Sequence, residues 1–297
     1  MMAVLTGQQS PDLQEPAGWR RNKNRIATIL MWLSFVLVIV PLVFVLYTVI
    51  AKGISIISWQ FLTSPIPPSV LPAGVGGVGP AVLGTLEITA LATVIAVPLG
   101  ILGAVYLNEY GGGNWLSKFI GFMADVMTGV PSIIMGLFIF SIWVLKFGFS
   151  GLAGAFALAA LMLPIVIRST YEMLRLVPDS LREGSYALGA SKSRVTLTVV
   201  LPAAIGGIVS GVLLAVARAA GETAPLLFTI LTVTEANPNV FSGANTSLPS
   251  QIFVNASSPY PGAQARGWGS ALTLIAIAFI LMIAARLVTA RFARYQR

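Results

Sequence analysis

The stretch IATILMWLSFVLVIVPLVFVLYTVIA, residues 26–51, contains 26 consecutive residues without a charged side chain. A helix needs about 20 apolar residues to cross the hydrocarbon core of a bilayer. A cleavable signal peptide has a shorter apolar region that ends in a small-residue cleavage motif, and this stretch has neither feature. We therefore predict an uncleaved membrane-spanning helix at this position.

Five further apolar stretches follow, at about residues 81–107, 119–145, 151–167, 201 to beyond 228, and 268–287. The chain of 297 residues is 56% hydrophobic and only 9% charged, with a mean hydropathy of +0.87. In a typical soluble domain about 25% of the residues are charged. This composition cannot cover a water-exposed surface, so the predicted fold class is an all-α integral membrane protein with six transmembrane helices.

Basic residues between the apolar stretches indicate the orientation. If the N-terminus is cytoplasmic, 14 of the 18 basic residues face the cytoplasm. The exceptions are Lys52, Lys146 and Arg266, which fall outside, and Arg218, which lies within a span. Cytoplasmic loops of membrane proteins carry such an excess. Both termini are therefore predicted to be cytoplasmic, and the net charge of +8 reflects orientation and not a nucleic-acid partner.

The same pattern predicts the organisation of the chain. A cytoplasmic tail of residues 1–25 precedes a transmembrane domain of residues 26–290, and residues 291–297 form a second cytoplasmic tail. Two outer segments, 52–80 and 232–267, are rich in Pro and Gly or in Asn, Ser and Pro. We expect both to be irregular or interfacial surface.

The inner segment RSTYEMLRLVPDSLREGSYALGASKSRVTLTVVLP, residues 168–202, is too patterned for a simple turn. Asp179 or Ser180 is a candidate N-cap, Glu183 has capping-box spacing from Ser180, and Gly189 is a candidate stop. We predict a short amphipathic helix that has three apolar contact residues: Leu181, Tyr186 and Leu188. Such a helix either rests on lipid headgroups or docks a partner protein.

The portion EGSYALGASKSRVTLTVVLP, residues 183–202, resembles the EAA loop of ABC-importer permeases. In that family an acidic residue, two small residues and a glycine six positions after the acid form a coupling helix, which sits in a groove of the cytoplasmic ATPase. Glu183 and Gly189 match this pattern, while Gly184 and Ser185 replace two alanines and lower the helix propensity. The resemblance implies that a coupling loop at about 169–200 contacts an ATPase through these four residues.

Most of residues 25–290 resembles the PstA-type permeases of phosphate importers. The resemblance is carried by GTLEITALATVIAVPLGILGAVYLNEY (84–110), GVPSIIMGLF (129–138), LPIVIRSTYEMLRLVPDSLREGSYALG (163–189) and ARAAGETAPLLFT (217–229). It implies a type I ABC importer permease in the inner or plasma membrane of a prokaryote. Such a subunit spans the lipid bilayer several times and forms half of a translocation pathway.

The resemblance also implies the partners: a paralogous permease in a heterodimer, two copies of a cytoplasmic ATPase, an extracytoplasmic phosphate-binding protein, and inorganic phosphate as cargo. ATP hydrolysis would belong to the ATPase, because this chain has no G-x-x-x-x-G-K-[ST] phosphate loop. The chain also has no cysteine or histidine, the usual thiolate and imidazole metal ligands. We expect neither a catalytic activity nor a metal or cofactor in this subunit.

Two opposite charges lie inside the fifth apolar stretch. Arg218 and Glu222 are four residues apart, which places them on one face of a helix. Pro225 has no N–H for the carbonyl of Gly221, so we predict a broken or kinked helix that lines a cavity. Charged groups within a span are functional candidates. The pair either lies on the substrate pathway, with Arg218 contacting the anion, or is an ion pair that locks two spans together.

Three further ionisable residues lie at or near the spans. Arg168 ends the fourth apolar stretch, and it either anchors that helix to headgroups or, as the family resemblance suggests, contacts substrate on its exit. Asp125 is expected to pair with a basic group of this subunit or of its partner. Glu87 is expected to be hydrated near the outer interface.

Three other functions compete with that of a phosphate importer permease. A secondary transporter or ion channel also has six spans and intramembrane charges, but it does not need the patterned loop that begins at Glu183. A membrane enzyme lacks a recognisable catalytic motif here, although a serine–lysine arrangement stays open. A permease for another oxyanion, such as sulfate or molybdate, would differ only in its substrate.

Overall fold

The computed structural model describes residues 18–293, and helices joined by turns and irregular segments make up that range. A boundary between two compact units falls between Thr48 and Val49, near the end of the first helix. In chain order the elements are α1 (Gly18–Gly53), α2 (Trp59–Thr63), α3 (Gly79–Val105), η1 (Tyr106–Tyr110), α4 (Trp115–Gly129), α5 (Ser132–Ile139), η2 (Phe140–Val144), α6 (Leu145–Phe147), α7 (Gly151–Arg175), α8 (Asp179–Ala187), α9 (Lys192–Val195), η3 (Thr196–Val200), α10 (Leu201–Ala220), α11 (Leu226–Thr229), α12 (Leu248–Ala256) and α13 (Pro261–Ala293).

The first apolar stretch forms the long helix α1, as predicted. This helix already begins at Gly18, so the basic residues of the predicted N-terminal tail lie in its first turns. Residues 1–17 of that tail and residues 294–297 of the predicted C-terminal tail lie outside the described residues. Residues 291–293 belong to α13. The helices at both ends therefore extend beyond the predicted spans.

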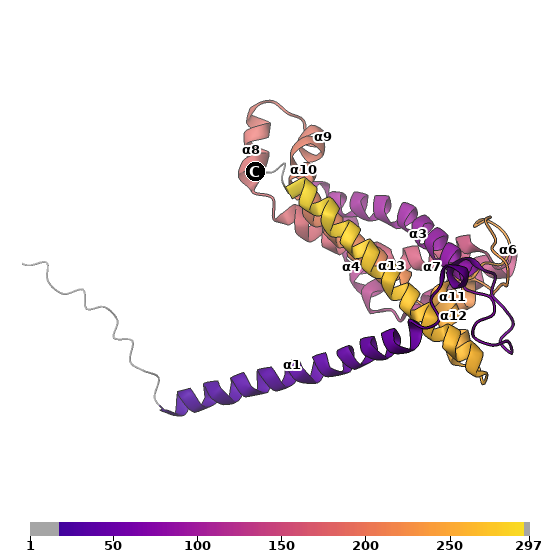
Figure 1. The fold of residues 1–297 in the computed structure, drawn as a ribbon. Coiled ribbons are helices and arrows are strands. Elements are labelled where there is room, and N and C mark those ends of the chain that lie inside the picture. The colour runs from indigo at the N-terminus through magenta and orange to yellow at the C-terminus, as the bar shows by residue number, and fades with distance from the viewer. Residues whose placement is uncertain (1–17, 294–297) are drawn as a thin grey trace, which may run out of the picture. The chain divides into compact units, whose positions relative to one another are not determined.

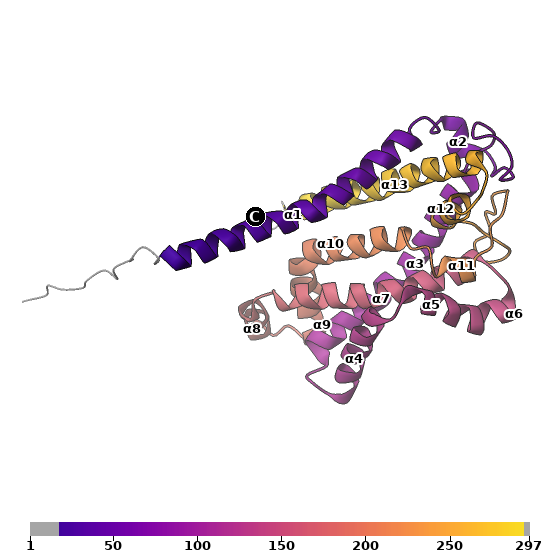
Figure 2. The ribbon, with the colours of Figure 1, turned by 90° about the horizontal axis from the view of Figure 1, so that it is seen from below.

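The second unit is a bundle in which α3, α7, α10 and α13 are the long helices (Figures 1 and 2). Its main core cluster lies between α3, α7 and α10 and includes Ala92, Ala96, Ala155 and Ala159. In a bilayer, lipid is as apolar as a leucine side chain, so small residues that allow close helix packing drive association. The alanine-rich faces of α3 and α7 explain why these two helices form the centre of the bundle.

The third apolar stretch is not one straight span. Helices α4 and α5 are separated at Val130 and Pro131, and their axes are bent by 107°. Val130 is extended, with φ −74° and ψ 128°, because a residue that precedes proline disfavours the helical conformation. The described residues thus contain five helices long and apolar enough to cross a membrane, or six if the bent pair forms one span.

The two segments expected to be irregular or partly interfacial surface are interior in part, so that expectation was wrong for those parts. Residues 52–80 contain α2, and Phe61 of α2 is buried with Val78, Ala81 and Leu248 in a core cluster of its own. Residues 245–251 are all buried. Arg266, expected in an outer loop, lies in α13 and donates hydrogen bonds to four carbonyls of residues 68–72, at 2.8–3.3 Å. Buried backbone groups need partners, and this arginine supplies them.

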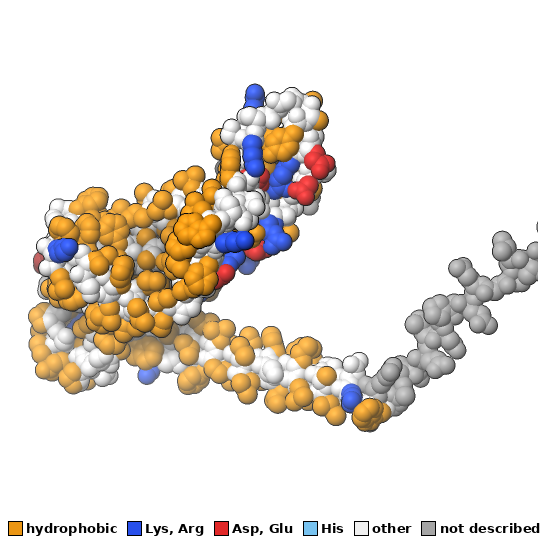
Figure 3. Space-filling view, turned by 180° about the vertical axis from the view of Figure 1, so that it is seen from behind, with side chains coloured by type: hydrophobic (Ala, Val, Ile, Leu, Met, Phe, Trp, Pro, Cys, Tyr) orange, Lys and Arg blue, Asp and Glu red, His pale blue; other side chains and the backbone are white. Residues whose placement is uncertain are grey.

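Opposite the end that carries α2 and α12, the elements α8 and α9 form a lobe (Figure 2). Figure 3 shows that charged side chains gather on this lobe, while the helical body of the bundle presents mostly hydrophobic side chains. This distribution of charged and hydrophobic side chains is the one expected if the helical body lies in lipid and the lobe lies in water.

Candidate functional site

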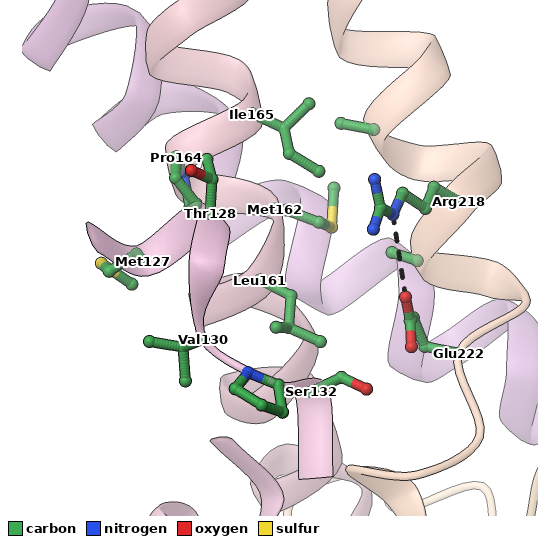
Figure 4. A pocket seen from close by; sticks show the side chains of 13 residues that line it. Met127, Thr128, Val130, Ser132, Leu161, Met162, Pro164, Ile165, Arg218 and Glu222 are labelled. Carbon is green, nitrogen blue, oxygen red and sulfur yellow. Dashed lines mark ion pairs between the residues drawn. The ribbon is translucent and has the colours of Figure 1, made fainter. Parts of the chain in front are cut away.

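A cavity of about 270 Å³ opens where the break between α4 and α5 faces α7 and the end of α10 (Figure 4). It combines apolar walls with one arginine, one glutamate and two hydroxyl groups. Its lining residues are Met127, Thr128, Val130, Pro131, Ser132, Leu161, Met162, Pro164, Ile165, Ala215, Arg218, Ala219 and Glu222.

The predicted helix break is present beside this cavity. Helix α10 ends at Ala220, and α11 begins only at Leu226, with Pro225 as its N-cap residue. The helix ends earlier than we expected from Pro225 alone. The N–H of Gly221 donates to the carbonyl of Arg218 at 3.1 Å, which closes a tight last turn and leaves Glu222 outside the helix. Gly221 therefore ends the helix, and Pro225 starts the next one.

Arg218 and Glu222 form a loose pair. Their closest approach, between Nε and Oε1, is 3.8 Å, which is longer than a hydrogen bond. The Arg218 side chain is 70% exposed and that of Glu222 is 23% exposed. Figure 4 shows the guanidinium directed from α10 toward the side of the cavity where Met162 lies. Within residues 18–293 no hydrogen bond to the protein uses the Arg218 side chain, so its donors are available to an anion.

The opposite wall was not predicted from the sequence. Thr128 and Ser132 flank the break between α4 and α5, and both line the cavity. The Thr128 hydroxyl donates to the Asp125 carbonyl at 2.6 Å, while Ser132 is the first residue of α5. The signal that could have located them is Pro131, which interrupts an otherwise continuous apolar stretch.

The two helix breaks meet because α5 packs directly on the second one. A Cβ added at Gly136 of α5 would lie 2.6 Å from Cα of Pro225, so only glycine allows this approach. This contact brings the break at Val130 and Pro131 to the break at Gly221. The cavity is therefore a product of two irregular backbone segments in contact, a place where non-helical backbone can occur inside a membrane protein.

Arg168 is not part of this cavity. It lies in α7 and forms an ion pair with Asp125 of α4, and its Nη2 also donates to the Gly121 carbonyl at 3.5 Å. The Arg168 and Asp125 side chains are 35% and 60% exposed. Asp125 thus pairs within its own chain, which was one of the two expected possibilities. The structure does not bring Arg168 and Arg218 together at one cavity.

Glu87, in α3, is half-buried and so is only partly in the expected hydrated state. Its Oε2 is buried and has no hydrogen-bond partner among the described residues. Burying a carboxylate oxygen without a partner is costly. No lining residue of the Arg218 cavity comes from α3, so Glu87 is separate from the candidate site.

The short helix α8 runs from Asp179 to Ala187. The predicted capping box was wrong: Pro178 is the N-cap residue and no side chain caps the helix, because the Asp179 carboxylate instead accepts from Arg182 at 2.9 Å. The predicted stop is confirmed, since Gly189 has φ +80° and the Ala190 N–H donates to the Ser185 carbonyl. Glu183 and Gly184 are exposed, as are the three apolar contact residues Leu181, Tyr186 and Leu188.

Comparison with known proteins gives both a family and close relatives. Residues 96–294 match the family model described as binding-protein-dependent transport system inner membrane component. The phosphate transport system permease protein PstA 1 of Mycobacterium tuberculosis H37Rv is 45% identical over 272 residues, which cover 91% of this chain and 88% of the relative. PstA of Yersinia pestis is 43% identical over 279 residues, which cover 92% of each chain.

Solved structures show the same fold at low sequence identity. A chain of the MetNI methionine ABC transporter, in an inward-facing conformation, superposes with a TM-score of 0.57 and 19% identity over 73% of this chain and 94% of its own. A chain of a bacterial ABC transporter that imports alginate gives 0.58 and 13% identity over 92% and 96%. The predicted all-α fold of a type I ABC importer permease is thereby confirmed.

Proposed function

Because the chain belongs to the family of binding-protein-dependent transport system inner membrane components, we propose that it forms half of the translocation pathway of an ATP-driven phosphate importer. The relatives named above are phosphate transport system permeases, which supports phosphate over sulfate or molybdate as cargo. The family also disfavours a secondary transporter.

The proposed assembly follows from the same family. A paralogous permease completes the pathway, two copies of an ATPase dock at α8, and a phosphate-binding protein delivers the cargo at the opposite end. Residues 26–290 are the permease domain, with the coupling loop at about 169–200 and both termini in the cytoplasm. The exposed Leu181, Tyr186 and Leu188 support this docking, because they give α8 an apolar surface that no part of the described chain covers.

The loose pairing of Arg218 is the observation that carries the proposal. A guanidinium offers a planar fork of N–H donors that suits phosphate oxygens, and here that fork opens into a cavity. Glu222 would repel a fully ionised anion but would accept a hydrogen bond from a protonated phosphate. We infer that Glu222 holds Arg218 when the pathway is empty and that Arg218 contacts phosphate when it is occupied.

The test is phosphate uptake by the complete transporter in liposomes. Arg218→Gln should lower uptake at least about 10-fold, since a hydrogen bond to a charged group contributes about 1.5–3 kcal/mol, while the complex still assembles and hydrolyses ATP. Arg25→Gln in α1 is the matched control, because Arg25 is exposed, has no ion pair among the described residues and lies outside the coupling loop. Wild-type uptake by Arg218→Gln would exclude the proposed role and leave the ion-pair lock as the explanation.

A further inference from the structure

A buried arginine holds α8 against the rest of the bundle. Nε and Nη2 of Arg182 donate to Oε1 of Glu109 at 3.3 and 3.0 Å. Nη2 also donates to the Leu174 carbonyl at 3.0 Å, and Nη1 donates to the Val177 carbonyl at 2.7 Å. The Arg182 and Glu109 side chains are only 13% and 4% exposed. One guanidinium therefore connects α8, the end of α7 and the segment η1.

The other side of the coupling loop contacts the same segment. Nζ of Lys192, in α9, lies 5.2 Å from the ring centroid of Tyr110, the residue that follows Glu109 in η1. Asn108 donates to Glu109 Oε1 at 2.7 Å and fixes the carboxylate from within η1. The elements before and after Gly189 are thus both attached to η1, which is a π-helical turn at the end of α3. Such turns often occur at functional sites.

Apolar packing contributes little to holding α8. None of its residues is buried, and its leucine and tyrosine side chains face outward. The hydrogen bonds and ion pair of Arg182 are therefore its principal attachment. They are directional, since a planar guanidinium that shares its donors among four acceptors fixes both the position and the orientation of the helix.

Helix α3, which continues into η1, packs closely against α7. A Cβ at Gly100 of α3 would lie 2.6 Å from Cγ1 of Val166, and one at Gly103 would lie 3.5 Å from Cγ1 of Ile167. Ile167 precedes Arg168, which pairs with Asp125 three residues before Thr128 of the cavity wall. Close-packed interiors transmit displacement because they cannot be compressed.

We propose that Arg182 is a positioning residue that transmits movement of α8 to α3 and α7 through Glu109, and that phosphate transport requires this link. The proposal rests on the proposed function, because it takes α8 as the element that the ATPase moves. Arg182 itself touches neither phosphate nor, through its buried guanidinium, the docked ATPase.

The experiment measures phosphate transported per ATP hydrolysed by the complete transporter in liposomes. Arg182→Lys keeps the charge but cannot reach all four acceptors, and the double variant Arg182→Met with Glu109→Leu replaces the ion pair by apolar side chains without leaving a lone buried charge. In both variants the ratio should fall about 5- to 150-fold, the range of coupling between linked sites. Arg25→Gln in α1 is the control and should keep the wild-type ratio, because Arg25 is exposed and lies outside the coupling loop.

A second readout separates transmission from docking. The chain contains no cysteine, so Ser185→Cys introduces a single thiol on α8 that can be cross-linked to a cysteine placed in the ATPase. We expect cross-linking to persist in the Arg182 variants while the ratio falls. A wild-type ratio in either Arg182 variant, or loss of the cross-link together with the ratio, would overturn the proposal. A wild-type complex that moves no phosphate would instead refute the proposed function, and with it this inference.

Discussion

The pairs Arg182–Glu109 and Arg218–Glu222 combine the same two residue types in opposite ways. The first has an N–O distance of 3.0 Å, is largely buried and shares its guanidinium with three backbone and side-chain acceptors besides Glu109. The second has a distance of 3.8 Å, and its arginine is 70% exposed. A guanidinium whose donors are all used holds protein elements together, whereas one whose donors are unused can bind a passing anion.

The surroundings of the two guanidinium groups produce this difference: Arg182, in the short helix α8, is bonded to the end of α7, whereas Arg218 lies in the last turn of α10. At and just after the end of α7 the carbonyls of Leu174 and Val177 accept hydrogen bonds from Arg182, and the Leu174 carbonyl also accepts one from the Val177 N–H. At the end of α10 the N–H of Gly221 satisfies the carbonyl of Arg218. The Arg218 guanidinium is therefore not needed by its own helix end and stays at the cavity.

The largest effect on stability is expected from breaking the buried pair. Glu109→Gln leaves Arg182 buried without its countercharge and should destabilise the fold by about 3–5 kcal/mol, seen as a lower thermal midpoint of the purified complex. Asp179→Asn is the matched control, because Asp179 contacts the same arginine but is 87% exposed. Equal effects of the two substitutions would contradict the buried pair's structural role.

A smaller loss of stability is expected from a substitution where the two helix breaks are in contact. Gly136→Ala places a methyl group against the backbone of Pro225 and should cost about 1–3 kcal/mol through overpacking. It should also weaken phosphate binding at Arg218, since it separates the two breaks. Gly206→Ala in α10 is the control, because no atom lies within 4 Å of an added Cβ there. Similar thermal midpoints for the two variants would show that the close contact is not required.

Breaking the third ion pair, Arg168–Asp125, is expected to cause an intermediate loss of stability. Both side chains are partly exposed, so Asp125→Asn should cost at most about 1 kcal/mol. Thermal unfolding of the complex measures this cost. If uptake falls far more than stability does, Arg168 acts on the pathway, and if neither changes, the pair is an ordinary surface contact.

The smallest loss of stability is expected at the loose pair. Glu222→Gln should cost at most about 0.5 kcal/mol, because the pair is too long for a hydrogen bond and its arginine is exposed. It should nevertheless improve phosphate binding, because Arg218 would no longer be held by a competing carboxylate. The rise in thermal midpoint with added phosphate measures this binding, with sulfate as the comparison anion. Weaker stabilisation by phosphate in this variant would mean that Glu222 helps to bind the anion.

Local sequence patterns predicted the elements that depend on local causes. Apolar stretches located the long helices, Gly189 located the end of α8, and the charges in RAAGETAPLLF located one wall of the cavity. The break at Val130 and Pro131 has a local signal too, but we predicted a continuous span, because the apolar stretch hides the effect of a single proline.

The amino-acid sequence by itself determined that this chain is a bundle of apolar helices with a polar loop at 168–202 and two charges beside a helix break, because hydropathy, glycine and proline act on their own neighbours. Only the tertiary structure decided which charges meet. Glu109 and Arg182 are 73 positions apart, and Arg168 and Asp125 are 43 positions apart. Their contacts exist because small residues let α3, α4 and α7 pack closely, and no local pattern encodes a distance between helices.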